Sequence, residues 1–172
     1  MRPKVESEEL STRGRRALGV MAVAVVASLT WLQRAYRNLA ALGVGETRDS
    51  PASAVAWFLI PVANWLLTYA VLRDLYTLSD RSDPHGLNQP RSLLIRLWWL
   101  FWAAPPVASI FSLLFLERPG LGTTSARVQA LVSFDLTSLA VASVLAALII
   151  IRVTSLQEAS HNWLEFNADA GL

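Results

Sequence analysis

Four long runs of apolar, uncharged residues dominate the chain, and the charged residues fall almost entirely between them. The runs cover about residues 17–33, 52–72, 97–116 and 128–151. A helix needs about 17–25 mainly apolar residues to cross the hydrocarbon core of a bilayer. Each run is long enough, so the pattern predicts an all-α fold, an integral membrane bundle of four transmembrane helices.

The runs also divide the chain into segments. We expect residues 1–16 to form a mobile charged arm, residues 17–152 a four-helix transmembrane domain, and residues 153–172 a polar, amphipathic tail. Membrane strands would alternate apolar and polar residues, which these runs do not do. A soluble helical bundle is the main alternative, and four uncharged runs of near-membrane length argue against it.

The distribution of positive charge predicts an orientation. Most of the 15 Lys and Arg residues lie in the N-terminal arm, in the second loop and at the start of the tail. Positive residues favour the cytoplasmic side of a membrane. Both termini are therefore predicted to be cytoplasmic, in a chain that crosses the membrane several times.

Composition excludes several classes of function. The chain is 53% hydrophobic and 16% charged, with a mean hydropathy of +0.40. Its net charge of +2 is too small for a nucleic-acid binder, which needs a basic face. No Cys and two His leave little for metal or haem ligation. Phosphate-loop, GxSxG and HExxH motifs are absent, so we expect no cofactor, no metal site, no catalytic residue and no enzyme activity.

Two polar residues fall inside predicted spans. Asp135 is the one acid within a span, and Asn64 lies near the middle of the second. A charge at membrane depth is costly, and it needs a partner or a proton. Asp135 is therefore either an ion or proton site, or a structural carboxylate. In the second case it is bonded to Ser133, Thr137 or a neighbouring helix, or paired with Arg34 or Arg37. Asn64 is either part of such a site or a hydrogen-bonding contact between helices.

Prolines interrupt two of the predicted spans. Pro61 removes a backbone donor from the second span, which should kink there. Pro105 and Pro106 should break the third span at a comparable depth. Two interrupted helices at one depth can form a binding site, as in secondary transporters, or they can simply pack together.

A polar face follows the first span. Arg34, Arg37 and Asn38 share one side of a helix at spacings of three and four residues. They can bind lipid phosphates, or they can hold Glu46 and Asp49 in the following loop. The sequence leaves both interpretations open.

The favoured function is an accessory or interaction subunit in a homo-oligomer or a larger membrane complex, with membrane lipids and other transmembrane subunits as partners. Small residues on the fourth span support helix contact. They are Ala140, Ala142, Ser143, Ala146 and Ala147. The alternative is a small transporter or channel that uses Asp135, Asn64 and the proline-interrupted helices.

Longer segments resemble a known family. They are WLQRAYRNLAALG (Trp31–Gly43), SPASAVAWFLIPVANWLLTYAVLRDLY (Ser50–Tyr76), a Trp-rich third span and VTSLQE (Val153–Glu158). Together they resemble the bacterial membrane family catalogued as domain of unknown function 4328, from Trp31 to about Glu158. The resemblance implies a multi-pass protein of a bacterial cytoplasmic (inner) membrane, and it implies no activity or catalytic residue.

Overall fold

The described part of the chain consists mainly of helices. The computed structural model describes residues 2–80, 93–112, 114 and 125–169. Within these residues it contains α1 (Arg2–Ala41), α2 (Pro51–Leu59), α3 (Pro61–Leu78), α4 (Leu93–Phe111) and α5 (Ser125–Asp169), and no strand. The predicted all-α class is confirmed. Segment 2–16, predicted to be a mobile arm, is helical and belongs to α1.

Three of these helices are long and apolar enough to cross a membrane. They are Gly14–Ala41 of α1, Leu93–Phe111 of α4 and Arg127–Asp169 of α5. The remaining predicted span, residues 52–72, is divided between α2 and α3. The prediction of four spans is therefore not confirmed.

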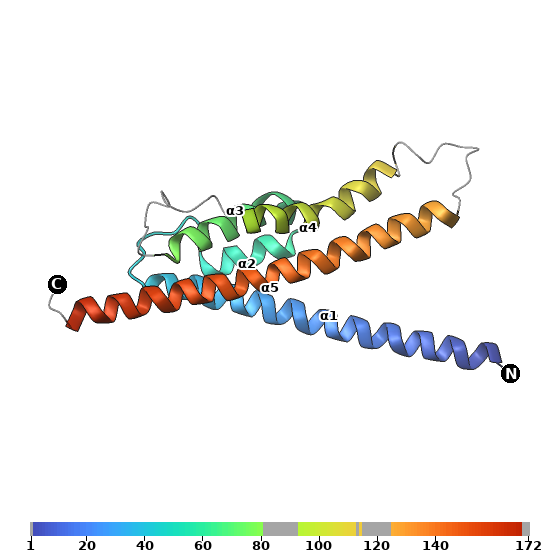
Figure 1. Cartoon of the computed structure of the whole chain (residues 1–172), viewed down its shortest axis with the longest axis horizontal. Helices are drawn as coiled ribbons and strands as arrows, with labels where there is room; N and C mark the ends of the chain where they lie inside the picture. The colour runs from blue at the N-terminus through green and yellow to red at the C-terminus, as the bar shows by residue number, and fades with distance from the viewer. Residues whose placement is uncertain (1, 81–92, 113, 115–124, 170–172) are drawn as a thin grey trace.

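The division between α2 and α3 lies at one residue. Ile60 has an extended backbone, with φ −92° and ψ 113°, and Pro61 starts α3. A residue before proline is biased away from the helical region, and proline is well suited to the first turn of a helix. The chain reverses here, because Arg48, just before α2, forms an ion pair of 3.4 Å with Asp74 near the end of α3. Helices α2 and α3 thus form a hairpin with both ends at one end of the bundle (Figure 1).

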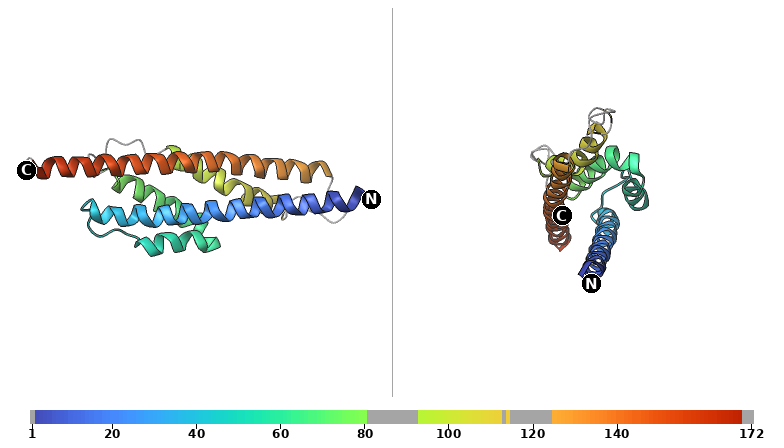
Figure 2. Two further views of the ribbon diagram at one scale, coloured as in Figure 1. Left: turned by 90° about the horizontal axis from the view of Figure 1, so that it is seen from below. Right: turned by 90° about the vertical axis from the view of Figure 1, so that its right-hand side faces the viewer.

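The two longest helices run in the same direction. Trp31 of α1 donates a hydrogen bond from Nε1 to Thr154 of α5, and Asn38 donates one to Gln157 further along both helices. Both helices follow the long axis of the molecule (Figure 2). The start of α1 and the end of α5 consequently lie at opposite ends of the bundle (Figure 1), whereas the sequence predicted both termini on one side.

Helix α4 is continuous where the sequence predicted a break. Pro105 and Pro106 lie inside it, and it continues to Phe111. The two prolines remove hydrogen bonds to carbonyls one turn earlier, but their fixed φ is close to the helical value. The extensive packing of α4 along α5 supports the helix through this position.

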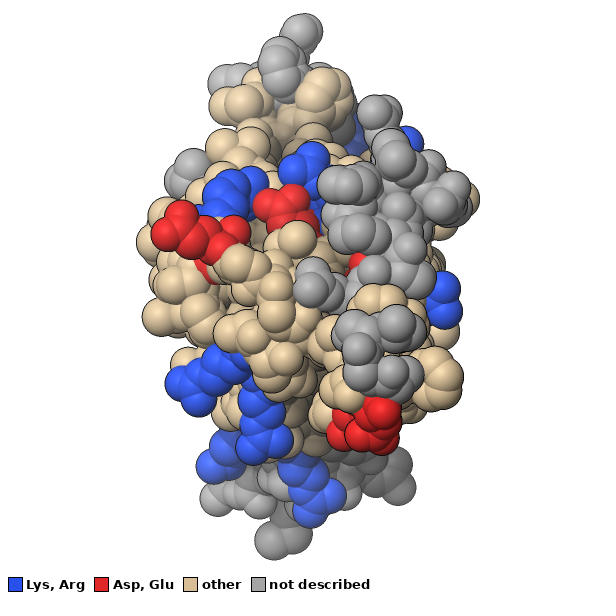
Figure 3. All heavy atoms as spheres, turned by 90° about the vertical axis from the view of Figure 1, so that its left-hand side faces the viewer, with Lys and Arg blue, Asp and Glu red and all other residues tan. Residues whose placement is uncertain are grey.

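We call the end of the bundle where α2 begins and α3 ends the hairpin end. The hydrophobic core is concentrated there. Its fully buried members include Leu39, Val71, Leu75 and Val153, from α1, α3 and α5. The start of the apolar part of α1 leaves this core, and the most apolar window of Gly14–Ala41 is only 6% buried. Figure 3 views the bundle from the hairpin end, where acidic and basic side chains gather at the surface.

Candidate functional site

A pocket lies between α3, α4 and α5. It has a volume of about 240 Å³. It is lined by Trp65, Phe101, Trp102, Pro105, Pro106, Asp135 and Leu139, and we call it the Asp135 pocket. Six of these residues are aromatic or aliphatic, so the carboxylate of Asp135 is the single charged group in an apolar wall.

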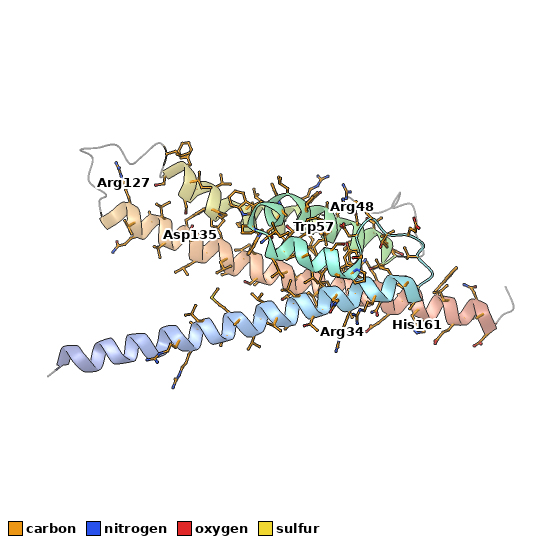
Figure 4. All side chains as sticks on the ribbon, turned by 180° about the vertical axis from the view of Figure 1, so that it is seen from behind. Arg34, Arg48, Trp57, Arg127, Asp135 and His161 are labelled. Carbon is orange, nitrogen blue, oxygen red and sulfur yellow. The ribbon has the colours of Figure 1, made fainter. Side chains whose placement is uncertain are left out.

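Asp135 has no ion-pair partner within the described part of the chain. Its Oδ1 atom is buried and accepts no hydrogen bond there. Thr137, a suggested partner, donates instead to the carbonyl of Ser133. Arg34 cannot pair with it, because Asp135 lies toward the start of α5 and Arg34 toward the hairpin end (Figure 4). Four crossings would make the first and last spans antiparallel and bring these residues close, whereas α1 and α5 are parallel in the structure.

Two further polar atoms near this pocket also lack partners in the described residues. They are Nε1 of Trp102, which lines the pocket, and Oδ1 of Asn64, one residue before the lining Trp65. A buried polar atom without a hydrogen bond costs free energy, of the order of 1–3 kcal/mol. The structure thus places Asp135 and the two prolines of α4 around one pocket, with Asn64 next in sequence to its wall.

The aromatic walls are held by specific contacts. Trp99 donates a hydrogen bond of 2.8 Å from Nε1 to the carbonyl of Trp65, which fixes α4 against α3. The ring of Trp99 also contacts Tyr69 edge to face, with 6.2 Å between centroids. Trp98 stacks on Trp102, with 6.1 Å between centroids and 5° between planes. These contacts restrain Trp65 and Trp102, two of the rings that line the pocket.

A polar network at the hairpin end was missed by the sequence analysis. Gln157 of α5 donates to the carbonyl of Ala35 (2.9 Å) and to Oγ of Ser79 (3.1 Å), and it accepts from Asn38 (3.1 Å). Ser160 donates to the carbonyl of Ser79 at 2.9 Å. We call this set the Gln157 network. It joins α1, α5 and the end of α3, and the only sequence signal for it was the VTSLQE segment.

A second network fixes the start of the hairpin. Asp49 is 7% exposed, and it accepts hydrogen bonds from Arg48 (2.8 Å) and from Nε1 of Trp57 (2.8 Å). Arg48 also reaches Asp74. The hydrogen bond with Asp49 is the main cause that raises the pKa of Arg48. Arg48 and Trp57 thus satisfy Asp49, which forms no ion pair with Arg34 or Arg37 among the described residues.

The predicted polar face of α1 is divided in the structure. Asn38 belongs to the Gln157 network, whereas Arg34 and Arg37 are exposed and form no ion pair among the described residues. Contact of these arginines with lipid phosphates stays a prediction. No group of three or more His, Cys, Asp or Glu side chains that could hold a metal ion occurs in the described part of the chain.

The architecture and the pocket together define a class, a helical membrane protein with a helix hairpin beside three candidate spanning helices. Comparison with protein families then identifies the family. Residues 11–156 match the domain of unknown function 4328 (DUF4328), and the chain belongs to this family. No curated protein matches the chain, and no solved structure does.

Proposed function

We propose that this chain is a non-enzymatic membrane protein that acts as an accessory or interaction subunit of a homo-oligomer or a larger complex in the bacterial cytoplasmic membrane. The observation that carries the proposal is the apolar start of α1. Between Gly14 and Ser28, every side chain is exposed within the chain. Large apolar members such as Leu18, Val20 and Val23 are at least 67% exposed. A spanning helix normally packs against neighbours along its length, so this segment has room for another transmembrane helix.

The small residues of α5 support the same proposal. Ala142 is buried and Ala146 partly buried within the chain, whereas Ala140, Ser143 and Ala147 are exposed. The exposed three recur at spacings of three and four residues, which places them on one side of α5. Small residues allow close approach of a second helix in lipid.

The experiment is purification in mild detergent, followed by native mass spectrometry of what remains bound. We expect a homo-oligomer or a defined complex, and the double variant Ala140→Leu/Ala147→Leu should dissociate it. The matched control is Ala130→Leu, which is exposed on the same helix. At 3.6 residues per turn it lies roughly 80–100° away from both positions. A monomer in all cases, or equal dissociation by the control, would contradict the proposal.

A second candidate is a small transporter or channel, and the Asp135 pocket favours it. Its carboxylate faces apolar walls at membrane depth, beside the Pro105–Pro106 pair of α4. Ionisable groups in that setting are characteristic of ion and proton pathways. The test is cation or proton flux into liposomes. If Asp135→Asn abolishes flux and leaves assembly unchanged, transport is the function, and if no flux is seen with the natural chain, this candidate is excluded.

A further inference from the structure

The Asp135 pocket combines two features that together select one kind of ligand. Three aromatic residues line it, namely Trp65, Phe101 and Trp102, and one carboxylate is present. Aromatic faces attract cations, most strongly where water is excluded, and aromatic cages are a recurring way to bind quaternary ammonium groups. A carboxylate whose Oδ1 has no partner in the described residues supplies the counter-charge.

An inorganic cation fits this pocket less well. Hard metal ions such as Ca²⁺ need several oxygen ligands, usually six to eight. The pocket offers one carboxylate, and its other lining side chains are indole, phenyl, proline and leucine. An alkylammonium group needs no such shell, because its methyl or methylene groups lie against apolar and aromatic walls.

The second unpartnered atom adds a requirement. Nε1 of Trp102 is a buried donor without an acceptor among the described residues. A ligand oxygen would satisfy it, whereas a second cationic group would not. The volume of about 240 Å³ lies below the range of roughly 300–1,000 Å³ of drug-sized sites, so the ligand is small.

We infer that the Asp135 pocket binds a small organic ammonium cation that carries an oxygen acceptor, with the cation beside Asp135 and the aromatic rings and the oxygen at Nε1 of Trp102. The ammonium group comes either from a soluble amino alcohol or from the headgroup of an amine-bearing phospholipid. This inference deepens the second candidate function, but binding does not require transport. It is independent of the subunit proposal, which rests on α1 and the exposed side of α5.

The test uses the full chain in nanodiscs of phosphatidylglycerol, which carries no amine. Choline chloride and tetramethylammonium chloride are titrated by calorimetry, with potassium chloride at equal ionic strength as the control. We expect both organic cations to bind and potassium not to compete. Choline binding that disappears in nanodiscs of phosphatidylcholine or phosphatidylethanolamine, with that lipid co-purifying, assigns the site to a headgroup, and unchanged binding assigns it to a soluble ligand.

Two variants locate the binding. Asp135→Asn should lower the affinity for both cations about thirtyfold or more, because it removes a buried charge partner. Asp74→Asn makes the same change at an acid that is paired with Arg73 at the hairpin end, and it should have no effect. Trp102→Phe keeps an aromatic ring and removes the donor. It should lower the affinity for choline roughly threefold to tenfold and leave the affinity for tetramethylammonium, which has no oxygen, unchanged.

Three results would overturn the inference. The first is no binding of either cation in phosphatidylglycerol nanodiscs together with no amine lipid retained. The second is displacement of choline or tetramethylammonium by potassium at equal concentration. The third is an unchanged choline-to-tetramethylammonium ratio in Trp102→Phe, a measurement that remains available if Asp135→Asn does not fold. Failure of oligomer formation would leave the binding result intact, so the two proposals fail separately.

Discussion

The hairpin formed by α2 and α3 predicts a different number of membrane crossings from the apolar pattern of the sequence, and the two can be told apart by labelling. The nine residues of α2 extend about 14 Å at about 1.5 Å per residue. This is under half of a hydrocarbon core of about 30 Å, so α2 cannot cross and α3 returns to the side from which α2 entered. We therefore predict that the chain crosses three times, once each with α1, α4 and α5. Its two ends then lie on opposite sides of the membrane.

Single cysteines test this directly, since the natural chain has none. Suitable positions are Gly14 and Gly45, where an added Cβ meets nothing within 4 Å, and Asn162, which is exposed. We expect a membrane-impermeant maleimide to label Gly45→Cys and Asn162→Cys from one side of sealed vesicles and Gly14→Cys only from the other. All three should react once the vesicles are opened with detergent.

The competing arrangement gives the reverse grouping. Four crossings with both termini cytoplasmic would place Gly14→Cys and Asn162→Cys on one side and Gly45→Cys on the other. That result would refute the hairpin as a fold within the bilayer, whatever the label efficiency, because the grouping depends only on the number of crossings between the sites.

Further predictions concern stability, measured as the free energy of unfolding in mixed micelles. Gln157→Ala removes three hydrogen bonds of the Gln157 network and should cost about 2 kcal/mol, whereas the adjacent exposed Glu158→Ala should change it by less than about 0.5 kcal/mol. Equal effects would contradict the network. Trp57→Phe removes the donor to the Asp49 carboxylate and should cost about 1.5 kcal/mol, and no loss would show that this bond contributes nothing. Pro61→Ala should lower the free energy of unfolding by about 0.4–1 kcal/mol, because the ring of Pro61 restricts the unfolded chain to a backbone conformation that suits the start of α3. A variant more stable than the natural chain would refute that role.

The sequence predicted the helices better than their arrangement. Apolar length located three candidate spans, because each side chain contributes its own transfer free energy to the total. The same criterion of apolar length treated residues 52–72 as one span, because hydropathy does not show where the chain reverses direction. The signal for the reversal was local, in prolines at the first positions of both α2 and α3. Pro51 and Pro61 each mark the start of a helix, and Pro61 was interpreted as a kink instead.

The predicted number of crossings also determined which side chains the sequence placed near one another. With four crossings α1 and the last span are antiparallel, which brings Arg34 near Asp135. With the hairpin they are parallel, and Arg34 lies at the end where α1 contacts Thr154 and Gln157. The Asp135 pocket could not be predicted as a unit, because its walls come from three helices. Asp135 itself was identified correctly as a polar residue within an apolar helix, because that observation needs no partner.

The two ends of the bundle differ in a way that bears on function. At the hairpin end the buried polar groups of the Gln157 network are paired, and the hydrophobic core surrounds them. Toward the start of α5, the Asp135 pocket contains unpartnered polar atoms, and the apolar start of α1 lacks packing within the chain. Natural sequences satisfy local requirements except where function imposes another demand. If the hairpin end supplies most of the stability, substitutions around the Asp135 pocket should alter ligand binding or assembly more than they alter folding. The Asp135 pocket is therefore the first site at which the function of this family should be tested.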